Sequence, residues 1–371
     1  MGDAELVRLT IDAAIVRFGA TPTVLATHPS SFEDDADFVY KPLSREIWRS
    51  RSGLPKLRWL SQEASRLLFV AAVPFIPKRL RDRAVRAVLR RSKSPWLRAL
   101  TSASIALAVG GGYLGDRYLR ESLVSLLSYR YCIALGAQVE TMPLSISSAR
   151  HPLLRLALLS TKGVRWRARD ATTQNILIRS RAQPELVPDL AWLDTGVQTH
   201  AENREGICIA PVGSSFYADK GEPLRAWQAA RHLIERLDPQ STVRLVPMHR
   251  WSAALGDGGD DLACDRLETS IREMRPDLRV IQVRPTRYSE VRDAMAASEF
   301  AVCERLHAAL AAATSGTRAL ILGYEPKHLG VMTVAGLERL CGDLEGALSV
   351  EPEEIESKAK RQRALVEAAV L

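Results

Sequence analysis

The sequence lacks the patterns of a metal site and of a disulfide-stapled secreted protein. Its 371 residues include only five cysteines, which are odd in number and widely spaced, with no Cys-x-x-Cys pair: Cys132, Cys208, Cys264, Cys303 and Cys341. This usage predicts buried free thiols in a reducing cytosol and no bound metal. The opening residues, Met1 to Glu5, form neither a basic leader nor an apolar run.

Long apolar runs and aromatic residues are also scarce. The apolar run from Ile105 to Val109 is far shorter than the roughly 20 residues that a membrane span needs. These absences favour a cytoplasmic protein. Aromatic residues make up 6% of the chain, so basic stretches have no stacking platform for bases and nucleic acid is not an expected partner. The length predicts two domains of about 150–200 residues each.

Positive charge is concentrated in one stretch, although the net charge of the whole chain is only +8. Nine basic residues between Lys78 and Arg98 face a single acid, Asp82, and apolar residues lie between them at roughly helical spacing. This is a basic amphipathic segment. It could contact an anionic membrane surface or an anionic acceptor, or it could be an arginine-rich face in water.

Strand-like and helix-like segments alternate along the chain, which predicts an α/β protein with parallel sheets covered on both faces. In the first half, residues 3–17, 44–100, 117–135 and 170–180 are typical of helices, the last with Thr172 or Thr173 as its cap. An apolar run at 104–109 ends in a Gly110-Gly111-Gly112 turn. The second half predicts strands at 206–211, 242–247, 278–283, 300–303 and 318–322, with helices between them. Polar residues at 194–206 mark a linker, so we expect an N-terminal lobe of residues 1–198 and a C-terminal lobe of residues 199–371.

Two motifs at predicted strand ends carry groups that suit an anionic substrate. Cys303-Glu304-Arg305-Leu306-His307-Ala308 lies where a strand ends and a helix begins, where side chains point at a ligand cleft and the helix N-terminus favours anions. An arginine fork beside a histidine fits a phosphate or carboxylate that also exchanges a proton. The next strand end, Leu322-Gly323-Tyr324-Glu325-Pro326-Lys327-His328, adds two more basic groups. The alternatives are a salt-bridged arginine, a capping histidine and ordinary loop charges.

The string ERLHAALAAATSGTRALILGYEPKHLGVMTVAGL resembles the C-terminal signature of the polysaccharide pyruvyltransferases, with its Arg-Leu-His, its Tyr-x-Pro-Lys and its Gly-x-Met. Three further segments are similar to the family in order along the chain. They are Gly2-Asp3-Ala4, the turn Gly110 to Asp116, and Arg169-Asp170 followed by Pro188-Asp189.

This resemblance implies two Rossmann-like lobes similar to those of the two-lobed (GT-B-like) glycosyltransferases. It implies transfer of pyruvate from phosphoenolpyruvate to a sugar as a ketal, with no cofactor beyond this co-substrate. His307 would be the general acid, and Arg305 and Lys327 would neutralise the carboxylate and the departing phosphate. The other expected substrate-binding residues are Glu304, Tyr324 and His328 in the C-terminal lobe, and Asp3, Gly110, Gly111, Gly112 and Asp116 on the acceptor side. A lipid-linked acceptor would bring the enzyme to the inner face of the cell membrane.

Departures from the family pattern keep other interpretations open. Family members carry an arginine after the first strand of the second lobe, whereas this stretch is Ile209-Ala210-Pro211-Val212-Gly213, so Arg284 or Arg287 would have to supply that contact. The alternatives are a nucleotide-sugar glycosyltransferase, which could use Glu304 or Glu325, and a non-catalytic glycan-binding relative. In the family a strand also precedes the Gly-Asp pair. Since Gly2 follows Met1 directly, we expect the reading frame to begin upstream.

Overall fold

The protein is described here by a computed structural model covering residues 2–26, 37–40, 52–194, 204–213, 225–249 and 259–371. The chain divides into two compact units. The N-terminal unit is Thr10–Leu186 with Leu371, and the C-terminal unit is Met1–Leu9 with Val187–Val370. The division therefore falls at Val187, while the boundary expected from sequence, between residues 198 and 199, lies outside the described residues.

A five-stranded parallel sheet forms the centre of the C-terminal unit, in the order β12-β11-β10-β13-β14. Its strands are β10 (Ile207–Ala210), β11 (Thr242–Leu245), β12 (Arg279–Gln282), β13 (Phe300–Cys303) and β14 (Arg318–Ile321). Every residue of β10 and β13 is buried, as expected of central strands covered on both faces. All five strands agree with the sequence prediction. The order reverses direction between β10 and β13, which is the position where open α/β sheets bind ligands.

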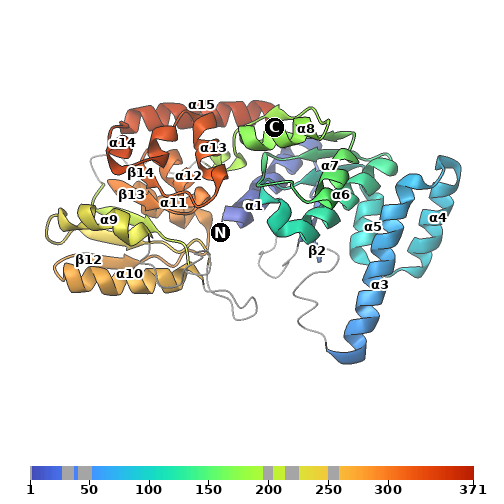
Figure 1. Ribbon diagram of the computed structural model, residues 1–371, viewed down its shortest axis with the longest axis horizontal. Helices are drawn as coiled ribbons and strands as arrows, with labels where there is room; N and C mark the ends of the chain where they lie inside the picture. The colour runs from blue at the N-terminus through green and yellow to red at the C-terminus, as the bar shows by residue number, and fades with distance from the viewer. Residues whose placement is uncertain (1, 27–36, 41–51, 195–203, 214–224, 250–258) are drawn as a thin grey trace. The chain divides into compact units, whose positions relative to one another are not determined.

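Helices between and after these strands cover the sheet (Figure 1). They are α9 (Arg225–Glu235), α10 (Asp260–Met274), α11 (Tyr288–Ala296), α12 (Leu306–Thr314), α13 (Pro326–Ala335), α14 (Leu344–Leu348) and α15 (Pro352–Val370), with 3-10 turns η4 (Leu190–Leu193) and η7 (Glu338–Cys341). Small residues make α12 the most enclosed of them, since Ala308 to Ala313 are all buried. Helices α11 and α15 and the turn η4 all contact α12, so this helix lies inside the unit.

The N-terminal unit also contains parallel strands, but three of them are interrupted at the same level. The first row is β3 (Ile105–Ala108), β5 (Gln138–Thr141) and β7 (Val164–Arg165), and the second is β4 (Gly111–Leu114), β6 (Leu144–Ile146), β8 (Arg167–Ala168) and β9 (Glu185–Leu186). Each strand of the first row resumes after one or two residues as a strand of the second. The predicted turn at Gly110–Gly112 is therefore only a break: Gly111 and Gly112 already belong to β4.

Close approach of two chain segments explains this break. A Cβ atom on Gly110 would lie 2.6 Å from the carbonyl oxygen of Pro143, well inside van der Waals contact. Pro143 stands at the matching interruption between β5 and β6, and proline has no N–H to continue a ladder. Glycine at 110 thus has a packing reason that is independent of any ligand.

Helices surround these strands, and two short strands form a separate sheet. The helices are α3 (Gly53–Ala72), α4 (Lys78–Arg91), α5 (Pro95–Ser102), α6 (Leu119–Ala134), α7 (Pro152–Leu159) and α8 (Ala171–Arg179), with 3-10 turns η2 (Val73–Phe75) and η3 (Asp116–Tyr118). Helix α1 (Gly2–Phe18) belongs to this unit from Thr10 onward and to the C-terminal unit before it. Strand β1 (Thr23–Ala26) pairs with β2 (Asp37–Tyr40). The cap of α8 is Asp170, which accepts from the Thr173 amide. The prediction of Thr172 or Thr173 as the cap is wrong, because the helix begins at Ala171 and the Asp170 side chain caps it.

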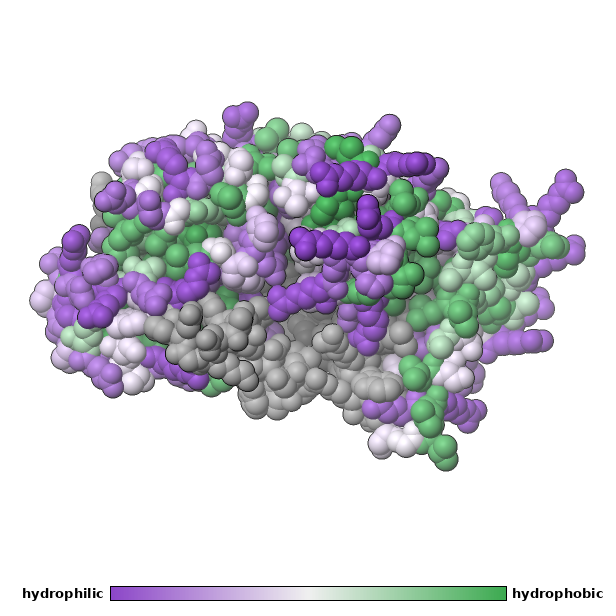
Figure 2. Space-filling view, viewed as in Figure 1, coloured by the Kyte–Doolittle hydropathy of each residue, from purple (hydrophilic) through white to green (hydrophobic). Residues whose placement is uncertain are grey.

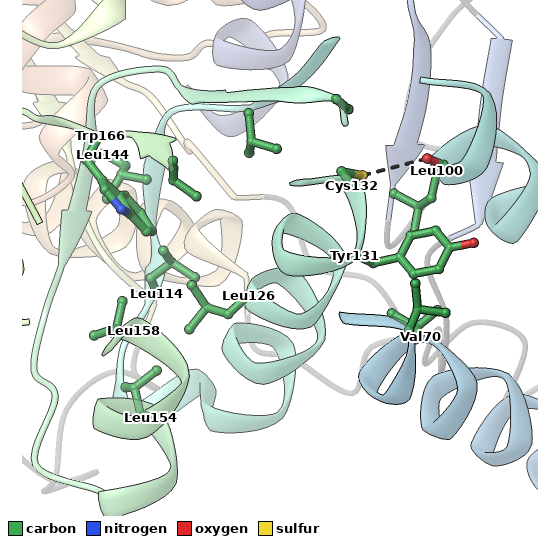
Figure 3. Close-up of a cluster of buried hydrophobic side chains, with 14 of the residues drawn as sticks. Val70, Leu100, Leu114, Leu126, Tyr131, Cys132, Leu144, Leu154, Leu158 and Trp166 are labelled. Carbon is green, nitrogen blue, oxygen red and sulfur yellow. Dashed lines mark hydrogen bonds between the residues drawn. The ribbon is translucent and has the colours of Figure 1, made fainter. Parts of the chain in front are cut away.

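The core of the N-terminal unit lies on both sides of α6 (Figure 3). On one side Leu126 packs near Leu114 of β4, and on the other Tyr131 meets Val70 of α3. Helix α6 thereby ties the sheet to the pair α3 and α4. No helix in the described ranges is long and apolar enough to cross a membrane.

All five cysteines are free thiols. Four are buried and Cys341 is partly so. Burial raises the pKa of Cys132, Cys208 and Cys341 to about 12, so these thiols stay protonated at neutral pH, as inert core residues do.

Candidate functional site

The carboxyl ends of β10 and β13 bring two loops together at the point where the sheet order reverses. Glu304, the first residue after β13, is completely buried, and its Oε2 accepts a hydrogen bond from the Val212 amide at 2.8 Å. Its own amide donates to Ala210 at the end of β10. Glu304 therefore joins the two central strands at the edge where a ligand is expected.

A buried ion pair lies beside this junction. The Arg305 guanidinium donates from Nε to Asp260 Oδ2 at 3.0 Å and from Nη2 to Asp260 Oδ1 at 2.7 Å. The Asp260 carboxylate, which is fully buried, also accepts from the amides of Gly213 at 2.8 Å and His249 at 2.9 Å. One carboxylate thus ties together the loops after β10, β11 and β13, and it fixes the guanidinium plane by a two-pronged contact.

The charge of Arg305 is firmly maintained. Burial alone would lower its pKa, but the hydrogen bonds and the charge of Asp260 raise it above the ordinary arginine value. Its Nη1 donates to the Tyr324 hydroxyl at 3.2 Å. Burial raises the pKa of Tyr324, so the phenol stays protonated. The Arg305 side chain keeps a small exposed fraction, which leaves a fixed cation at the rim of the sheet.

His307 lies two residues beyond Arg305, in the first turn of α12. Its side chain is half-buried, and its carbonyl oxygen accepts from the Tyr288 hydroxyl at 2.6 Å. The structure therefore places Arg305 and His307 together at one helix N-terminus, as the sequence indicates, where the helix dipole adds partial positive charge.

The loop after β14 contributes the second predicted cluster. Lys327 forms an ion pair with Glu325 at 2.5 Å. The ring of His328 lies 4.8 Å from that of Tyr324, and its Nδ1 is 3.0 Å from the Glu325 carbonyl oxygen. A Cβ atom on Gly323 would lie 2.8 Å from the His328 Cβ, so this turn passes too close for a side chain. Because Tyr324 contacts both Arg305 and His328, the two motifs form one cluster.

His328 is a neutral group in this cluster. Its side chain is fully buried, and burial lowers its pKa to about 4. At neutral pH it offers hydrogen bonds rather than a positive charge. The cations of the cluster are therefore Arg305 and Lys327.

The other predicted residues lie in different surroundings. Gly110, Gly111 and Gly112 stand at the break between β3 and β4. Asp116 accepts from the Arg150 and His151 amides at 2.8 and 3.0 Å. Although burial opposes it, these bonds hold the pKa of Asp116 below its usual value. Asp3 is in the first turn of α1, and its side chain is outside the described part of the chain.

Two contacts at the carboxyl edges of the sheets were not predicted from the sequence. Asp260 is the first residue of α10, where an acid is common because it is favoured by the helix dipole. In the N-terminal unit, buried Arg169 donates to Ser145 Oγ at 2.8 Å, and that hydroxyl donates to Asp170. The chain spacing between Ser145 and Asp170 gives no sign of this contact.

The arrangement in the C-terminal unit can hold an anion and deliver a proton. Arg305 and Lys327 supply positive charge, the Tyr324 hydroxyl can donate a hydrogen bond, and His307 supplies an imidazole that can exchange a proton. Within the described ranges no group of three or more His, Cys, Asp or Glu side chains could hold a metal ion.

The family model described as Polysaccharide pyruvyl transferase matches residues 57–326, which is most of the chain. The matched range includes Gly110–Gly112, Asp116, Glu304, Arg305, His307 and Tyr324. Asp3, Lys327 and His328 lie outside it. A comparison with curated proteins finds no match.

Proposed function

The chain belongs to the polysaccharide pyruvyl transferase family, and we propose that it moves pyruvate from phosphoenolpyruvate onto two hydroxyls of one sugar as a ketal. The observation that supports this most is the fixed Arg305 cation beside His307 at the sheet's switch point. A doubly charged enol phosphate needs such a cation, and its chemistry begins with protonation of carbon.

His307 protonates the methylene carbon of phosphoenolpyruvate, which becomes a methyl group and leaves a cationic centre at C2. A sugar hydroxyl attacks C2 and loses its proton, and the C2–O bond to phosphate breaks. A second hydroxyl of the same sugar then closes the ketal. Of the two hydroxyl protons, one restores His307 and the other leaves with phosphate.

Residues around His307 would stabilise the charges of this reaction. Arg305 and Lys327 would neutralise the carboxylate and the departing phosphate. Asp260 would act as a positioning residue, because it holds the Arg305 fork from behind. Glu304 would order the loop at Val212, and Tyr324 would complete the binding wall, with the buried His328 ring packed against it. In this proposal the reaction needs no cofactor beyond phosphoenolpyruvate.

The acceptor belongs to the same proposal. We assign it to a polysaccharide or lipid-linked saccharide as a class, with Asp116 and the Gly110–Gly112 segment of the N-terminal unit as the candidate contacts. Asp3, which the sequence also suggests for the acceptor, belongs to the C-terminal unit. A two-lobed, glycosyltransferase-like pairing of the units and a cytoplasmic location beside an anionic membrane are also parts of it.

The structure offers less support for a nucleotide-sugar glycosyltransferase. That reaction would use a carboxylate at the second-lobe rim to hold the nucleotide, and Glu304 and Glu325 are the candidates. Glu304 is fully buried and bonded to Val212, and Glu325 is paired with Lys327. A non-catalytic relative is the other alternative, since no arginine follows β10 at residues 211–213.

One assay separates these functions. The full chain is incubated with phosphoenolpyruvate and a panel of lipid-linked and nucleotide-linked saccharides, and released phosphate is measured. In parallel, nucleotide sugars are supplied without phosphoenolpyruvate and released nucleotide is measured. Acceptor-dependent phosphate release, with a mass gain of the product that equals pyruvate minus water, supports the proposal. Nucleotide release, or no turnover with any acceptor, contradicts it.

A further inference from the structure

The bend between α3 and α4 presents apolar and basic side chains together. Phe75 and Leu80 are 73% and 53% exposed, and Lys78, Arg79 and Arg83 between and beside them are exposed as well. We call these five residues the elbow surface. They lie within nine consecutive positions that turn from η2 into the first two turns of α4. Exposed apolar side chains beside cations are typical of segments that bind at a membrane interface.

The charge of this region is one-sided. Lys78, Arg79, Arg83, Arg86, Arg90 and Arg91 of α4 are exposed, against Asp82 as the only acid of the helix. Among the described residues, none of these six cations forms an ion pair with an acid. The acids of the described residues therefore leave these six cations unneutralised. Figure 2 shows long hydrophilic side chains projecting at the α4 end of the unit around hydrophobic ones.

The inner face of α4 already packs against the core of the unit, which limits how the elbow surface can bind a partner. Val85 is buried, and Val88 and Leu89 pack against the core. Arg81 donates to main-chain oxygens of Ile76 and of Ala134 in α6, so it clamps the bend onto the unit. The helix cannot roll over to bury its apolar side in a bilayer. The exposed side chains at the bend remain available to enter one.

We propose that the elbow surface docks the protein on an anionic lipid bilayer, with Phe75 and Leu80 inserted at the level of the headgroups. Interfacial helices bind in this way, with apolar side chains at the acyl boundary and cations among anionic headgroups. Complementary charge favours this occupant over a neutral membrane, and the exposed phenylalanine and leucine favour it over a soluble polyanion. The inference does not rest on pyruvyl transfer, because binding needs neither substrate nor turnover.

The test is co-sedimentation of the full chain with vesicles of phosphatidylcholine alone or with a third of phosphatidylserine, at low and at physiological salt. We expect binding to the anionic vesicles only, weakened by salt because the cations are exposed. Each cation near such a surface contributes about fivefold in affinity, corresponding to about 1 kcal/mol. Arg79→Gln with Arg83→Gln should therefore weaken binding by about 25-fold.

A second pair of substitutions tests the contribution of the apolar side chains Phe75 and Leu80. Phe75→Ser with Leu80→Ser leaves the charge unchanged and should still weaken binding by about tenfold or more, because inserted side chains lose their burial. Leu156→Ser is the matched control: Leu156 is 64% exposed on α7 of the same unit, away from the elbow surface in sequence, and should bind as the parent does. Thermal unfolding checks that each exposed substitution leaves the fold intact.

Several outcomes would overturn the proposal. These are no binding to anionic vesicles at low salt, equal binding to neutral vesicles, or binding that the Phe75 and Leu80 substitutions leave unchanged. Equal affinity for a single-stranded oligonucleotide, with the same dependence on Phe75, would assign the surface to nucleic acid instead.

Discussion

The two units place polar side chains at the carboxyl edge of a parallel sheet but use them differently. In the C-terminal unit, the Asp260 carboxylate fixes a charged guanidinium at the rim. In the N-terminal unit, Asp116 and Asp170 accept from main-chain amides, and the buried Arg169 bonds to a hydroxyl. The first edge holds a cation in place, whereas the described contacts of the second hold loops and a helix start. Chemistry is therefore expected to depend on the first edge, and stability on both.

The largest effect is expected at His307. His307→Ala removes the proposed general acid and should reduce turnover by about 10²–10⁴-fold, with little change in thermal unfolding because the side chain is only half-buried. His232→Ala, an exposed histidine on α9 of the same unit, is the matched control. Phosphate release from phosphoenolpyruvate is the measurement. Turnover within a few-fold of the parent would remove His307 from the mechanism.

The second-largest effect is expected from breaking the ion pair between Asp260 and Arg305. Asp260→Asn leaves a buried arginine without its counter-charge, so the free energy of unfolding should fall by about 3–5 kcal/mol. Glu367→Gln breaks the exposed Arg363–Glu367 pair on α15 and should cost at most about 1 kcal/mol. Urea unfolding of both variants gives the comparison. Equal losses in the two would show that burial of Asp260 adds nothing to this pair.

A substitution at Arg305 can distinguish the contribution of its positive charge from that of its two-pronged geometry. Arg305→Lys keeps a cation but cannot make both contacts to Asp260, so we expect about 2–4 kcal/mol less transition-state stabilisation. Isothermal titration with phosphoenolpyruvate and steady-state rates are the measurements. An unchanged affinity together with an unchanged rate would mean that this guanidinium is structural.

The sequence was sufficient for the C-terminal sheet but not for the contacts at its edge. Apolar runs such as 207–210 and 300–303 are buried on both sides, and such strands are visible in a single sequence. The predicted grouping of Arg305, His307 and Tyr324 also follows from strand ends that meet at one edge. The bidentate contact to Asp260 was not predictable, because 45 residues separate the partners and an acid in the first turn of a helix is common.

The broken sheet of the N-terminal unit was harder to predict. Its breaks arise from three strands meeting at one level, at residues 109–110, 142–143 and 166. Each break is too short to distinguish from a strand end by local pattern. The glycine run therefore suggested a ligand loop, where the described structure has a strand continuing from Gly111.

The pH dependence of stability should reveal the buried His328. Burial lowers its pKa to about 4 from a usual 6.5, so the folded state favours the neutral ring. The unfolded chain binds the proton more readily between these values, and stability should be full above pH 6.5 and fall as pH drops toward 4. The loss amounts to about 3 kcal/mol.

The measurement is urea unfolding at pH 7.5 and pH 4.5, for the parent and for His328→Gln. The variant starts less stable because it loses the ring contact with Tyr324, but its stability should fall less with acid. His232→Gln, which alters an exposed histidine, should follow the parent profile. Parallel profiles for the parent and His328→Gln would contradict the burial argument, whatever their absolute stabilities.

The smallest effect separates the two explanations of the glycine run. Gly110→Ala places a methyl group 2.6 Å from the Pro143 carbonyl oxygen, and the neighbouring backbone must shift. Overpacking of this kind typically costs about 1–3 kcal/mol. Urea unfolding and phosphate release are measured together. If Gly110→Ala loses stability while the rate per folded molecule is kept, the glycine serves the broken sheet. If stability is kept and the Michaelis constant for the sugar acceptor rises, Gly110 contacts the acceptor, and the N-terminal edge is a binding edge like its counterpart in the C-terminal unit.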